Sequence, residues 1–200
     1  NRIILATGRF NRPQDADRAL AAGQVDMVGM TRAQICDPEM ARKTFNQQAD
    51  EIRVCIACNQ ACIGHYALGA PISCIQFPES GRELQYGERS AASVSRDVLV
   101  VGGGPAGLKA AAVAAERGHR VTLYEKSARL GGQALLAQLL PQRSEFGGIV
   151  TNLEREARNA GVDIKTSVEM NGELIRSSGA DVVILACGAT PHIPEIETTD

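Results

Sequence analysis

Four of the six cysteines in this 200-residue chain lie in one segment, from Cys55 to Cys74. Their spacing is C-x2-C-x3-C-x11-C, in the stretch CIACNQACIGHYALGAPISC. Thiols at such spacing serve as ligands for zinc or an iron–sulfur cluster, or as partners in disulfides. Six cysteines in 200 residues fall short of the density of disulfide-stapled domains, and no secretory signal is visible. We therefore predict a metal site and a reducing, cytoplasmic location.

Zinc and iron–sulfur chemistry are the two alternatives for these thiols. Structural zinc sites usually pair two C-x2-4-C knuckles. Here Cys62 follows Cys58 after three residues, and Cys74 comes after eleven more. Three thiolates on one loop and a distant fourth suit a four-iron cluster, which offers ligand positions on different faces. The spacing favours the cluster and leaves zinc open, with Asn59 and Gln60 as candidates to tune a cluster by hydrogen bonding.

A second chemical signal is the glycine-rich turn Gly102-x-Gly104-x-x-Gly107, between a predicted strand and a predicted helix. The first glycine allows a tight turn, the second lets the backbone approach a pyrophosphate, and the third lets helix and strand pack closely. Glu125 ends the next predicted strand, where a carboxylate accepts hydrogen bonds from an adenosine ribose and repels a 2′-phosphate. A glycine-rich turn without a ligand is the plainer alternative, but the combination favours a dinucleotide site.

The elements that precede the cysteines alternate between strand and helix. They are a strand over residues 3–7, a helix over 13–22, a strand over 25–30 and a helix over 38–47. Asn11 is the expected N-cap of the first helix, and residues 31–37 are expected to form a loop. Strand–helix–strand–helix with short loops is typical of a parallel barrel or an open α/β sheet.

Residues 50–95 interrupt this alternation with a long loop, which predicts a function or a tether. A new domain begins at Asp97, with a continuous apolar strand of the kind found in sheets covered on both faces. Its predicted strands span residues 97–101, 120–124, 162–166 and 181–186, and its predicted helices span residues 105–117 and 145–160.

Composition limits the function classes. Apolar residues make up 44% of the chain and charged residues 22%, as in globular α/β proteins. The formal net charge of −2 shows no basic excess, so we expect no nucleic-acid partner. No apolar run approaches the length of a membrane span, so we expect no membrane partner. The start NRIILATGRF has no initiator methionine, which we interpret as a fragment of a longer polypeptide.

The stretch Arg129-Leu130-Gly131-Gly132-Gln133 resembles the flavoprotein disulfide-reductase group, where a double glycine lies near the flavin pyrophosphate. The resemblance implies FAD or ADP in this domain. The late stretch DVVILACGATPHIP also resembles that group, with Ala186-Cys187-Gly188 in place of its usual Ala-Thr-Gly. Cys187 is therefore predicted to be a small buried filler.

The whole chain resembles the NADH:flavin oxidoreductases of the multidomain old-yellow-enzyme type. The resemblance is carried, in order, by VDMVGMTRAQICDPEMARKT, EIRVCIACNQACIG, GRE, DVLVVGGGPAGLKAA and LGGQ. It implies an α/β protein with three parts. Residues 1–49 would be the last two βα units of an FMN-binding (β/α)8 barrel, residues 50–95 an iron–sulfur cluster loop and linker, and residues 96–200 an incomplete Rossmann-like FAD- or NAD(P)-binding domain.

The resemblance also implies site residues. The implied ligands of a [4Fe–4S] cluster are Cys55, Cys58, Cys62 and Cys74. The implied contacts of the FMN phosphate are Gly8, Arg9, Thr31 and Arg32, after the seventh and eighth barrel strands. The implied contacts of FAD or ADP are Gly102, Gly104, Ala106, Gly107, Glu125 and Gln133, with Arg143 and Val168 as weaker matches. No catalytic acid or base is expected within these 200 residues.

The function implied is that of an oxidoreductase. Electrons would pass between a dinucleotide domain, served by NAD(P)H and FAD, and barrel-bound FMN, which reduces an activated alkene such as an enoyl thioester. One alternative is an amine dehydrogenase or demethylase that delivers electrons to an external acceptor. Others are a non-catalytic electron-transfer module and a zinc-stapled nucleotide-binding protein. The substrate, the direction of electron flow and the oligomeric state do not follow from the sequence.

Overall fold

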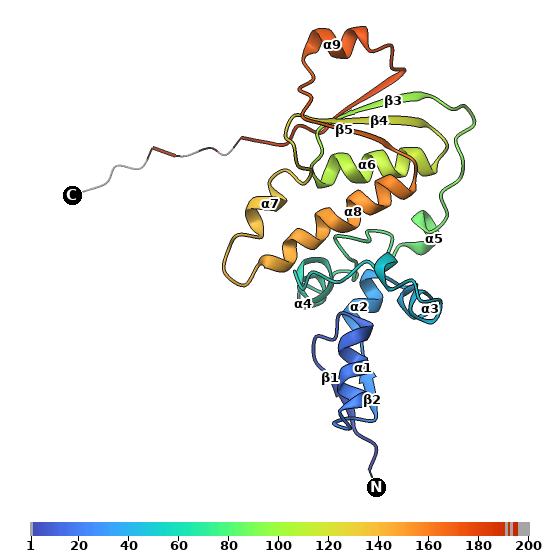
Figure 1. Cartoon of the computed structure of the whole chain (residues 1–200), viewed down its shortest axis with the longest axis vertical. Coiled ribbons are helices and arrows are strands. Elements are labelled where there is room, and N and C mark those ends of the chain that lie inside the picture. Colours follow the sequence, from blue (N-terminus) through green and yellow to red (C-terminus); the bar gives the residue numbers. More distant parts are fainter. Residues whose placement is uncertain (1, 191, 193, 196–200) are drawn as a thin grey trace, which may run out of the picture. The chain divides into compact units, whose positions relative to one another are not determined.

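The computed structural model describes residues 2–190, 192, 194 and 195. The end of the predicted third part, residues 196–200, lies outside the described residues, as do Pro191 and Ile193 of the stretch DVVILACGATPHIP. The chain divides into two compact units (Figure 1). One comprises Asn1–Ala92 and Ala134–Arg155, and the other comprises Ser93–Gln133 and Glu156–Asp200.

The first unit begins with two short parallel strands and a helix between them. These are β1 (Leu5–Thr7), α1 (Pro13–Ala21) and β2 (Met27–Gly29). Leu5 pairs with Met27 and Thr7 with Gly29. Pro13 occupies the first turn of α1, where its missing N–H costs nothing. The N-cap is Arg12 and not Asn11, so that part of the prediction was wrong: Asn11 is buried, and its amide donates to the Cys55 carbonyl at 3.2 Å.

Most of the segment 31–37, which the sequence predicted to be a loop, forms a helix. α2 spans Thr31–Cys36, and α3 spans Met40–Phe45. The helix forms because Ala33 and Cys36, three residues apart, are both buried. Ala33 belongs to a small core with Met40 and Ile52.

The segment after α3 consists of short helical turns. They are a 3₁₀ turn (Ala49–Glu51), a π-helical turn (Gln60–Gly64), α4 (His65–Ala67) and α5 (Glu83–Tyr86). Asp37 holds the start of this segment against α2. Its buried carboxylate accepts from the Lys43 ammonium at 2.7 Å and from the Arg53 backbone N–H at 2.8 Å. The remainder of the first unit holds α7 (Ala134–Ala137), a 3₁₀ turn (Ser144–Gly147) and the first part of α8 (Gly148–Asn159).

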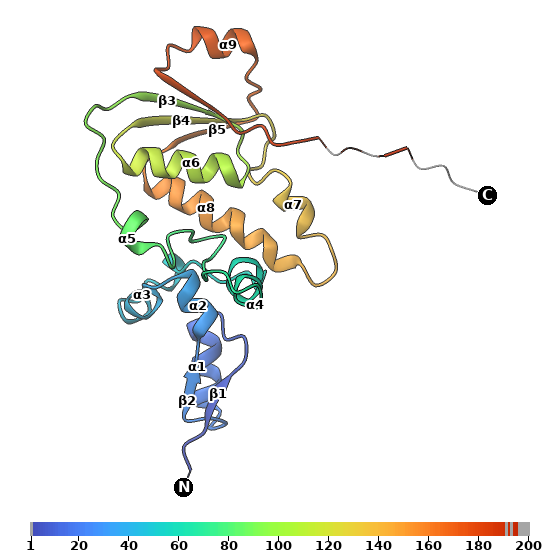
Figure 2. The same cartoon turned by 180° about the vertical axis from the view of Figure 1, so that it is seen from behind.

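The second unit is built on a four-stranded parallel sheet in the order β5-β4-β3-β6. The strands are β3 (Asp97–Val101), β4 (Arg120–Glu125), β5 (Asp163–Thr166) and β6 (Val182–Leu185). Its other helices are α6 (Pro105–Glu116) and α9 (Gly172–Ser177). In two opposite views, α6 lies on one side of this sheet and α9 on the other (Figures 1 and 2).

The central strand β3 pairs with a neighbour on each side. Leu99 lies opposite Thr122 of β4 and Val183 of β6. Val98 to Val101 are all buried, as the continuous apolar run predicted. α6 packs on the sheet through Leu108, Ala111 and Ala112, all fully buried. The predicted mixed α/β class with parallel strands is thus confirmed, and the barrel remains a prediction.

Candidate functional site

The four clustered cysteines line a single cavity in the first unit. Cys55, Cys58, Cys62 and Cys74 share its walls with Arg32, Ile35, Ile56, Asn59, Ala61, Ile75 and Gln76. All six cysteines of the chain lie in the described part, and all are free thiols. The disulfide alternative therefore has no support in the structure. The predicted ligand set is brought together by the fold, although eleven residues separate Cys62 from Cys74.

The backbone around these cysteines is shaped to turn N–H groups toward sulfur. Ala57 and Asn59, on either side of Cys58, both adopt the left-handed conformation, with φ of 53° and 57°. Such strained non-glycine residues concentrate at functional sites. Cys55 accepts from the N–H of Ala57, and Cys58 accepts from the N–H of Gln60.

Cys74 accepts a hydrogen bond of the same kind, from the N–H of Gln76, which again is the second residue after the cysteine. Repeated hydrogen bonds of this kind favour the charged thiolate, the form that binds metal.

The pKa values of the cysteine thiols are shifted in different directions. Burial raises the pKa of Cys55 and of Cys58, and the backbone N–H groups offset only part of that effect. A hydrogen bond from the Cys36 thiol lowers the pKa of Cys74 to about 6, against the opposing effect of burial. Cys36 is more deeply buried, and the same hydrogen bond together with burial raises its pKa. The pKa of Cys74 is thus shifted toward the charged form and that of Cys36 toward the neutral form.

The side chains, as they lie, do not form a site for a single ion. Among the described residues, no group of three or more His, Cys, Asp or Glu side chains could hold a metal ion. A zinc site requires its sulfurs to converge at about 2.3 Å from one point. A four-iron cluster takes its thiolates on different irons, so its ligands need only line a common cavity. Four soft thiols that line one cavity are a donor set suited to either metal centre, zinc or an iron–sulfur cluster.

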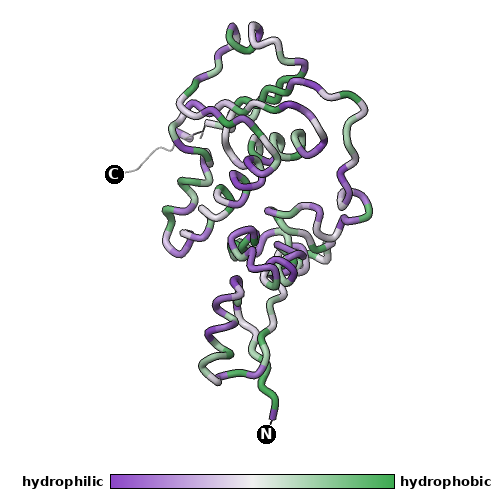
Figure 3. Tube along the Cα trace, turned by 45° about the vertical axis from the view of Figure 1, so that its right-hand side comes forward, coloured by the Kyte–Doolittle hydropathy of each residue, from purple (hydrophilic) through white to green (hydrophobic). Residues whose placement is uncertain are grey.

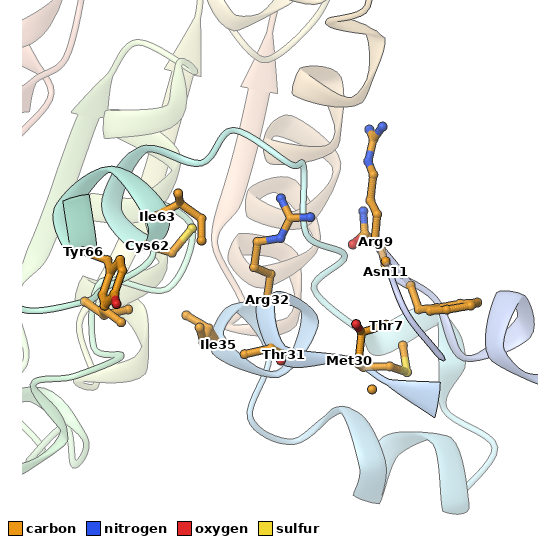
Figure 4. Close-up of a pocket in the computed structure, with 14 residues that line it drawn as sticks. Thr7, Arg9, Asn11, Met30, Thr31, Arg32, Ile35, Cys62, Ile63 and Tyr66 are labelled. Carbon is orange, nitrogen blue, oxygen red and sulfur yellow. The ribbon is translucent and has the colours of Figure 1, made fainter. Parts of the chain in front are cut away.

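The four residues predicted to bind the FMN phosphate line a second cavity, of about 450 Å³. Gly8 and Arg9 follow β1, and Thr31 and Arg32 begin α2 (Figure 4). The remaining walls include Cys62, Ile63 and Tyr66 from the cysteine segment. Arg9 is exposed and forms an ion pair with Glu145.

The two cavities of the first unit share part of their walls. Arg32, Ile35 and Cys62 line both the cysteine cavity and the 450 Å³ cavity. Arg32 also donates to the Asn59 side chain at 2.5 Å, inside the cysteine segment. The predicted phosphate residues and the predicted cluster ligands therefore belong to adjoining sites.

The glycine-rich turn of the second unit joins β3 to α6 through close backbone contacts. Gly102 has a φ of 112°, and a side chain there would collide with the Ala186 carbonyl. A Cβ on the buried Gly107 would collide with the Gly102 carbonyl oxygen. Gly104, the N-cap of α6, has open space around it and an ordinary φ of −74°. Gly102 and Gly107 are thus required by packing, whereas the space at Gly104 is available to a ligand.

Glu125 is tied to this turn by its carboxylate. One oxygen accepts from the Gly103 N–H at 2.7 Å, and the other accepts from the Ser127 N–H at 2.8 Å. Burial acts to raise the pKa of Glu125, but these N–H groups hold it below its usual range. The double glycine closes on the same turn, since the Gly131 N–H donates to the Gly103 carbonyl at 2.8 Å.

The remaining residues predicted to bind FAD or ADP do not all lie at the glycine-rich turn. Ala106 is exposed in the first turn of α6, and the Gln133 side chain donates to the Ala189 carbonyl at 2.5 Å. The Val168 N–H donates to the Glu125 carbonyl at 3.0 Å. Arg143 belongs to the first unit, where its guanidinium lies over the Phe146 ring. Arg143 is the one member of this set that the fold assigns to the other unit.

The sequence analysis did not connect several residues around the cysteines with this site. Cys36 appeared isolated, and Gln76 and Asn152 carried no motif, yet all three are buried near Cys74 in one hydrogen-bond chain. Asn11 was assigned to a helix cap. Cys187 was predicted to be buried and is exposed, with its sulfur 3.8 Å from the Val101 carbonyl oxygen, so that prediction was wrong.

Comparison with known proteins identifies the family to which the second unit is similar. Residues 96–199 match the family model described as pyridine nucleotide-disulphide oxidoreductase. The chain belongs to this family. The matched residues include the glycine-rich turn and Glu125.

Relatives of this pyridine nucleotide-disulphide oxidoreductase chain match nearly its whole length. It is 40% identical to NADH oxidase from Thermoanaerobacter brockii over 195 residues, 97% of this chain and 30% of that protein. The structure of a 2-naphthoyl-CoA reductase complex superposes with a TM-score of 0.91 at 32% identity, covering 98% of this chain and 30% of that one. Histamine dehydrogenase from Rhizobium sp. 4-9 superposes with a TM-score of 0.86 at 33% identity, covering 94% and 28%.

The chain therefore spans about 30% of the length of the relatives it matches. These relatives are flavin oxidoreductases of the old-yellow-enzyme and amine-dehydrogenase type, so the resemblance inferred from the motifs is confirmed. In the described residues, no helix has the length and apolar character needed to cross a bilayer.

Proposed function

We propose that this chain is the electron-transfer portion of a flavin- and iron–sulfur-dependent oxidoreductase. In the proposal, Cys55, Cys58, Cys62 and Cys74 hold a [4Fe–4S] cluster that, when bound, exchanges single electrons between two-electron carriers. FMN would be held by residues 1–49, as the end of a barrel, and FAD or ADP by residues 96–200. NAD(P)H would supply electrons for the reduction of an activated alkene such as an enoyl thioester.

The observation that carries this proposal is the shared wall between the two cavities of the first unit. Arg32, Ile35 and Cys62 line both cavities, so a group bound by the cysteines and a flavin in the larger cavity would be neighbours (Figure 4). A structural zinc site would have no need of such a neighbour. Cys62 would be the ligand nearest to the flavin, since it lines the flavin cavity itself.

The two-stranded β1–β2 sheet supports the barrel part of the proposal. Parallel sheets normally have both faces covered, and a two-stranded sheet is marginal by itself. Here Ile3, Ile4, Leu5 and Met27 are all more than half exposed. This hydrophobic stretch lies next to the N-terminus (Figure 3). Further strands of a barrel would cover these side chains.

The chain's own residues would have distinct tasks. Arg32, with a planar fork of donors, and Thr31, at the start of α2, would bind the FMN phosphate. Arg9 would leave Glu145 to join them. In the second unit, the turn at Gly104 would receive the pyrophosphate, and the free lone pairs of Glu125 would accept from a ribose hydroxyl.

A second candidate is an amine dehydrogenase that sends electrons outward to an external acceptor. The similarity to histamine dehydrogenase, with a TM-score of 0.86, favours it. The similarity to 2-naphthoyl-CoA reductase, with a TM-score of 0.91, favours the alkene reductase. The two functions differ in the reductant: NAD(P)H should bleach the flavin of an alkene reductase, and an amine substrate should bleach that of a dehydrogenase.

The deciding experiment is measurement of iron, acid-labile sulfide, zinc, FMN and adenine nucleotide in the full-length protein, purified without oxygen. We expect about four irons and four sulfides per chain, as for a [4Fe–4S] cluster, together with FMN. One zinc and no sulfide would overturn the proposal. Anaerobic addition of NADH, NADPH or amines to the same sample then separates the two candidate functions.

A further inference from the structure

Asn59, in the cysteine segment, is the hydrogen-bond partner of an arginine from the predicted flavin site. The Arg32 guanidinium, in the first turn of α2, donates to the Asn59 side-chain oxygen at 2.5 Å. A guanidinium carries only donors, so the oxygen of the Asn59 amide, and not its NH2 group, must face Arg32. The two residues are 27 positions apart, so this contact depends on the folded chain.

The backbone at Asn59 gives its side chain a constrained origin. Asn59 has a φ of 57° and a ψ of 14°, a left-handed conformation that asparagine adopts more readily than most residues. Its carbonyl oxygen accepts from the Gly64 N–H at 2.9 Å, at the end of the π-helical turn. A Cβ on Gly64 would lie 3.1 Å from that oxygen, so the turn is closely packed. The side chain of Asn59 is therefore held from a fixed part of the segment.

Arg32 lies on the boundary between two cavities. It lines the 450 Å³ cavity, where the FMN phosphate is proposed to bind (Figure 4), and also the cavity of the four cysteines. The hydrogen bond to Asn59 leaves other N–H donors of the guanidinium for a phosphate. Because the Asn59 amide is neutral, it holds the guanidinium without cancelling its charge. A carboxylate partner would compete with a phosphate, as Glu145 does at Arg9.

We propose that Asn59 is a positioning residue for the flavin site, whose side-chain oxygen holds the Arg32 guanidinium in the orientation that binds the phosphate of FMN. The inference rests on the proposed function, because it takes Arg32 as a ligand of that phosphate. An arginine already held in place loses less side-chain entropy when the phosphate binds, so the affinity is higher. Asn59 acts through Arg32, since it lines the cysteine cavity and is not among the residues that line the 450 Å³ cavity.

The test compares the affinity of FMN with that of riboflavin, which lacks the phosphate, by flavin titration of the full-length protein after removal of its flavin. Asn59→Gly removes the side chain and suits the left-handed backbone. Gln47→Gly is the matched control, because Gln47 is also left-handed, with a φ of 59°, and lines neither cavity. Iron and zinc content, measured on each variant, shows whether the cysteine segment remains loaded.

We expect Asn59→Gly to weaken FMN binding by roughly threefold to tenfold, the size of one net hydrogen bond, and to leave riboflavin binding unchanged. A general disturbance of the fold would weaken both flavins alike. Gln47→Gly should bind both flavins as the original protein does. In an Arg32→Lys background, Asn59→Gly should have little further effect, since both changes remove the same contact. If Asn59→Gly loses its metal, Asn59→Ala replaces it, because Ala57 already adopts the same conformation.

Two failures are distinguishable. A full-length protein that does not bind FMN would refute the proposed function and, with it, this inference. Saturable FMN binding whose affinity is unaffected by Asn59→Gly would overturn the inference alone. The inference would also fail if Asn59→Gly weakened FMN and riboflavin equally, or if it had the same effect in the original and Arg32→Lys backgrounds, because Asn59 would then not act through Arg32.

Discussion

The Arg32 guanidinium donates to the Asn59 side-chain oxygen at 2.5 Å, across 27 positions of sequence. Arg32 lies in the first turn of α2, among the residues predicted to hold a flavin phosphate. Asn59 is a left-handed residue between Cys58 and Cys62. One side chain of the predicted flavin site is thus hydrogen-bonded to a side chain of the predicted cluster segment.

Replacing Arg32 by lysine should therefore weaken FMN binding by tenfold or more, since hydrogen bonds to charged groups contribute about 1.5–3 kcal/mol. Lysine keeps the charge but loses the planar fork that serves a phosphate and Asn59 together. FMN retention on dialysis of the full-length protein measures the effect. Arg42→Lys, on the exposed surface of α3, is the matched control and should retain FMN. Equal retention by both variants would contradict the assignment of Arg32.

Replacing Cys58 by serine should cost the protein its cluster. A serine oxygen is a hard ligand where four soft thiolates are expected, and Cys58 lies in the middle of the strained turn. We expect iron and acid-labile sulfide to fall well below four per chain, while FMN and much of the fold remain. Cys187→Ser is the control, because Cys187 lies outside the cysteine cavity. Full iron content and full turnover in Cys58→Ser would disprove its role as a ligand.

Two glycines of the same turn should respond differently to alanine. Gly104 has room for a Cβ and an ordinary φ, so Gly104→Ala should fold normally and lose affinity for an adenine dinucleotide by occupying the space of its pyrophosphate. Gly107→Ala should instead destabilise the second unit by roughly 2–3 kcal/mol, because its Cβ meets the Gly102 carbonyl.

Thermal unfolding and cofactor content, measured on both variants of that turn, separate the two effects. Normal binding in a folded Gly104→Ala protein would exclude the turn as a pyrophosphate site.

Asp37 should contribute stability that depends on pH. Burial acts to raise its pKa, but hydrogen bonds from Lys43 and from the Arg53 N–H hold the pKa below the ordinary 3.8. A depressed pKa means that this contribution is complete above pH 3.8 and is lost as the pH falls through the lower native value. Asp37→Asn should therefore cost roughly 3 kcal/mol at pH 6, as expected for a broken buried pair.

The difference in the free energy of unfolding between the original protein and the Asp37→Asn variant should become smaller near pH 3. Asp163→Asn removes an exposed carboxylate that is 3.3 Å from Lys165, and it should cost less than about 1 kcal/mol at any pH. Urea unfolding at several pH values measures both. A cost for Asp37→Asn that does not change with pH would mean that its charge is not what stabilises the fold.

Several local structural features of this protein could be predicted from sequence because they depend on short stretches of chain. The turn at Gly102, Gly104 and Gly107 needs residues without side chains at fixed offsets, whatever surrounds it. The apolar run Asp97–Val101 predicted a strand covered on both faces, and β3 is buried as expected. The spacing of the four cysteines likewise identified one shared site, and the cavity they line agrees with it.

The tertiary structure decided what surrounds those motifs. Residues 31–36 form a helix because Ala33 and Cys36 are buried, Ala33 against Met40 and Ile52, and no local signal in the sequence indicates that burial. Asn11 does not cap α1 as expected; its side-chain amide donates to the Cys55 carbonyl, 44 positions away. Asn152 and Gln76, 76 positions apart, meet in a dry contact beside Cys36. Spacing along a chain determines which ligands lie together, but hydrogen bonds between distant segments form only when the whole fold brings them into a space without water.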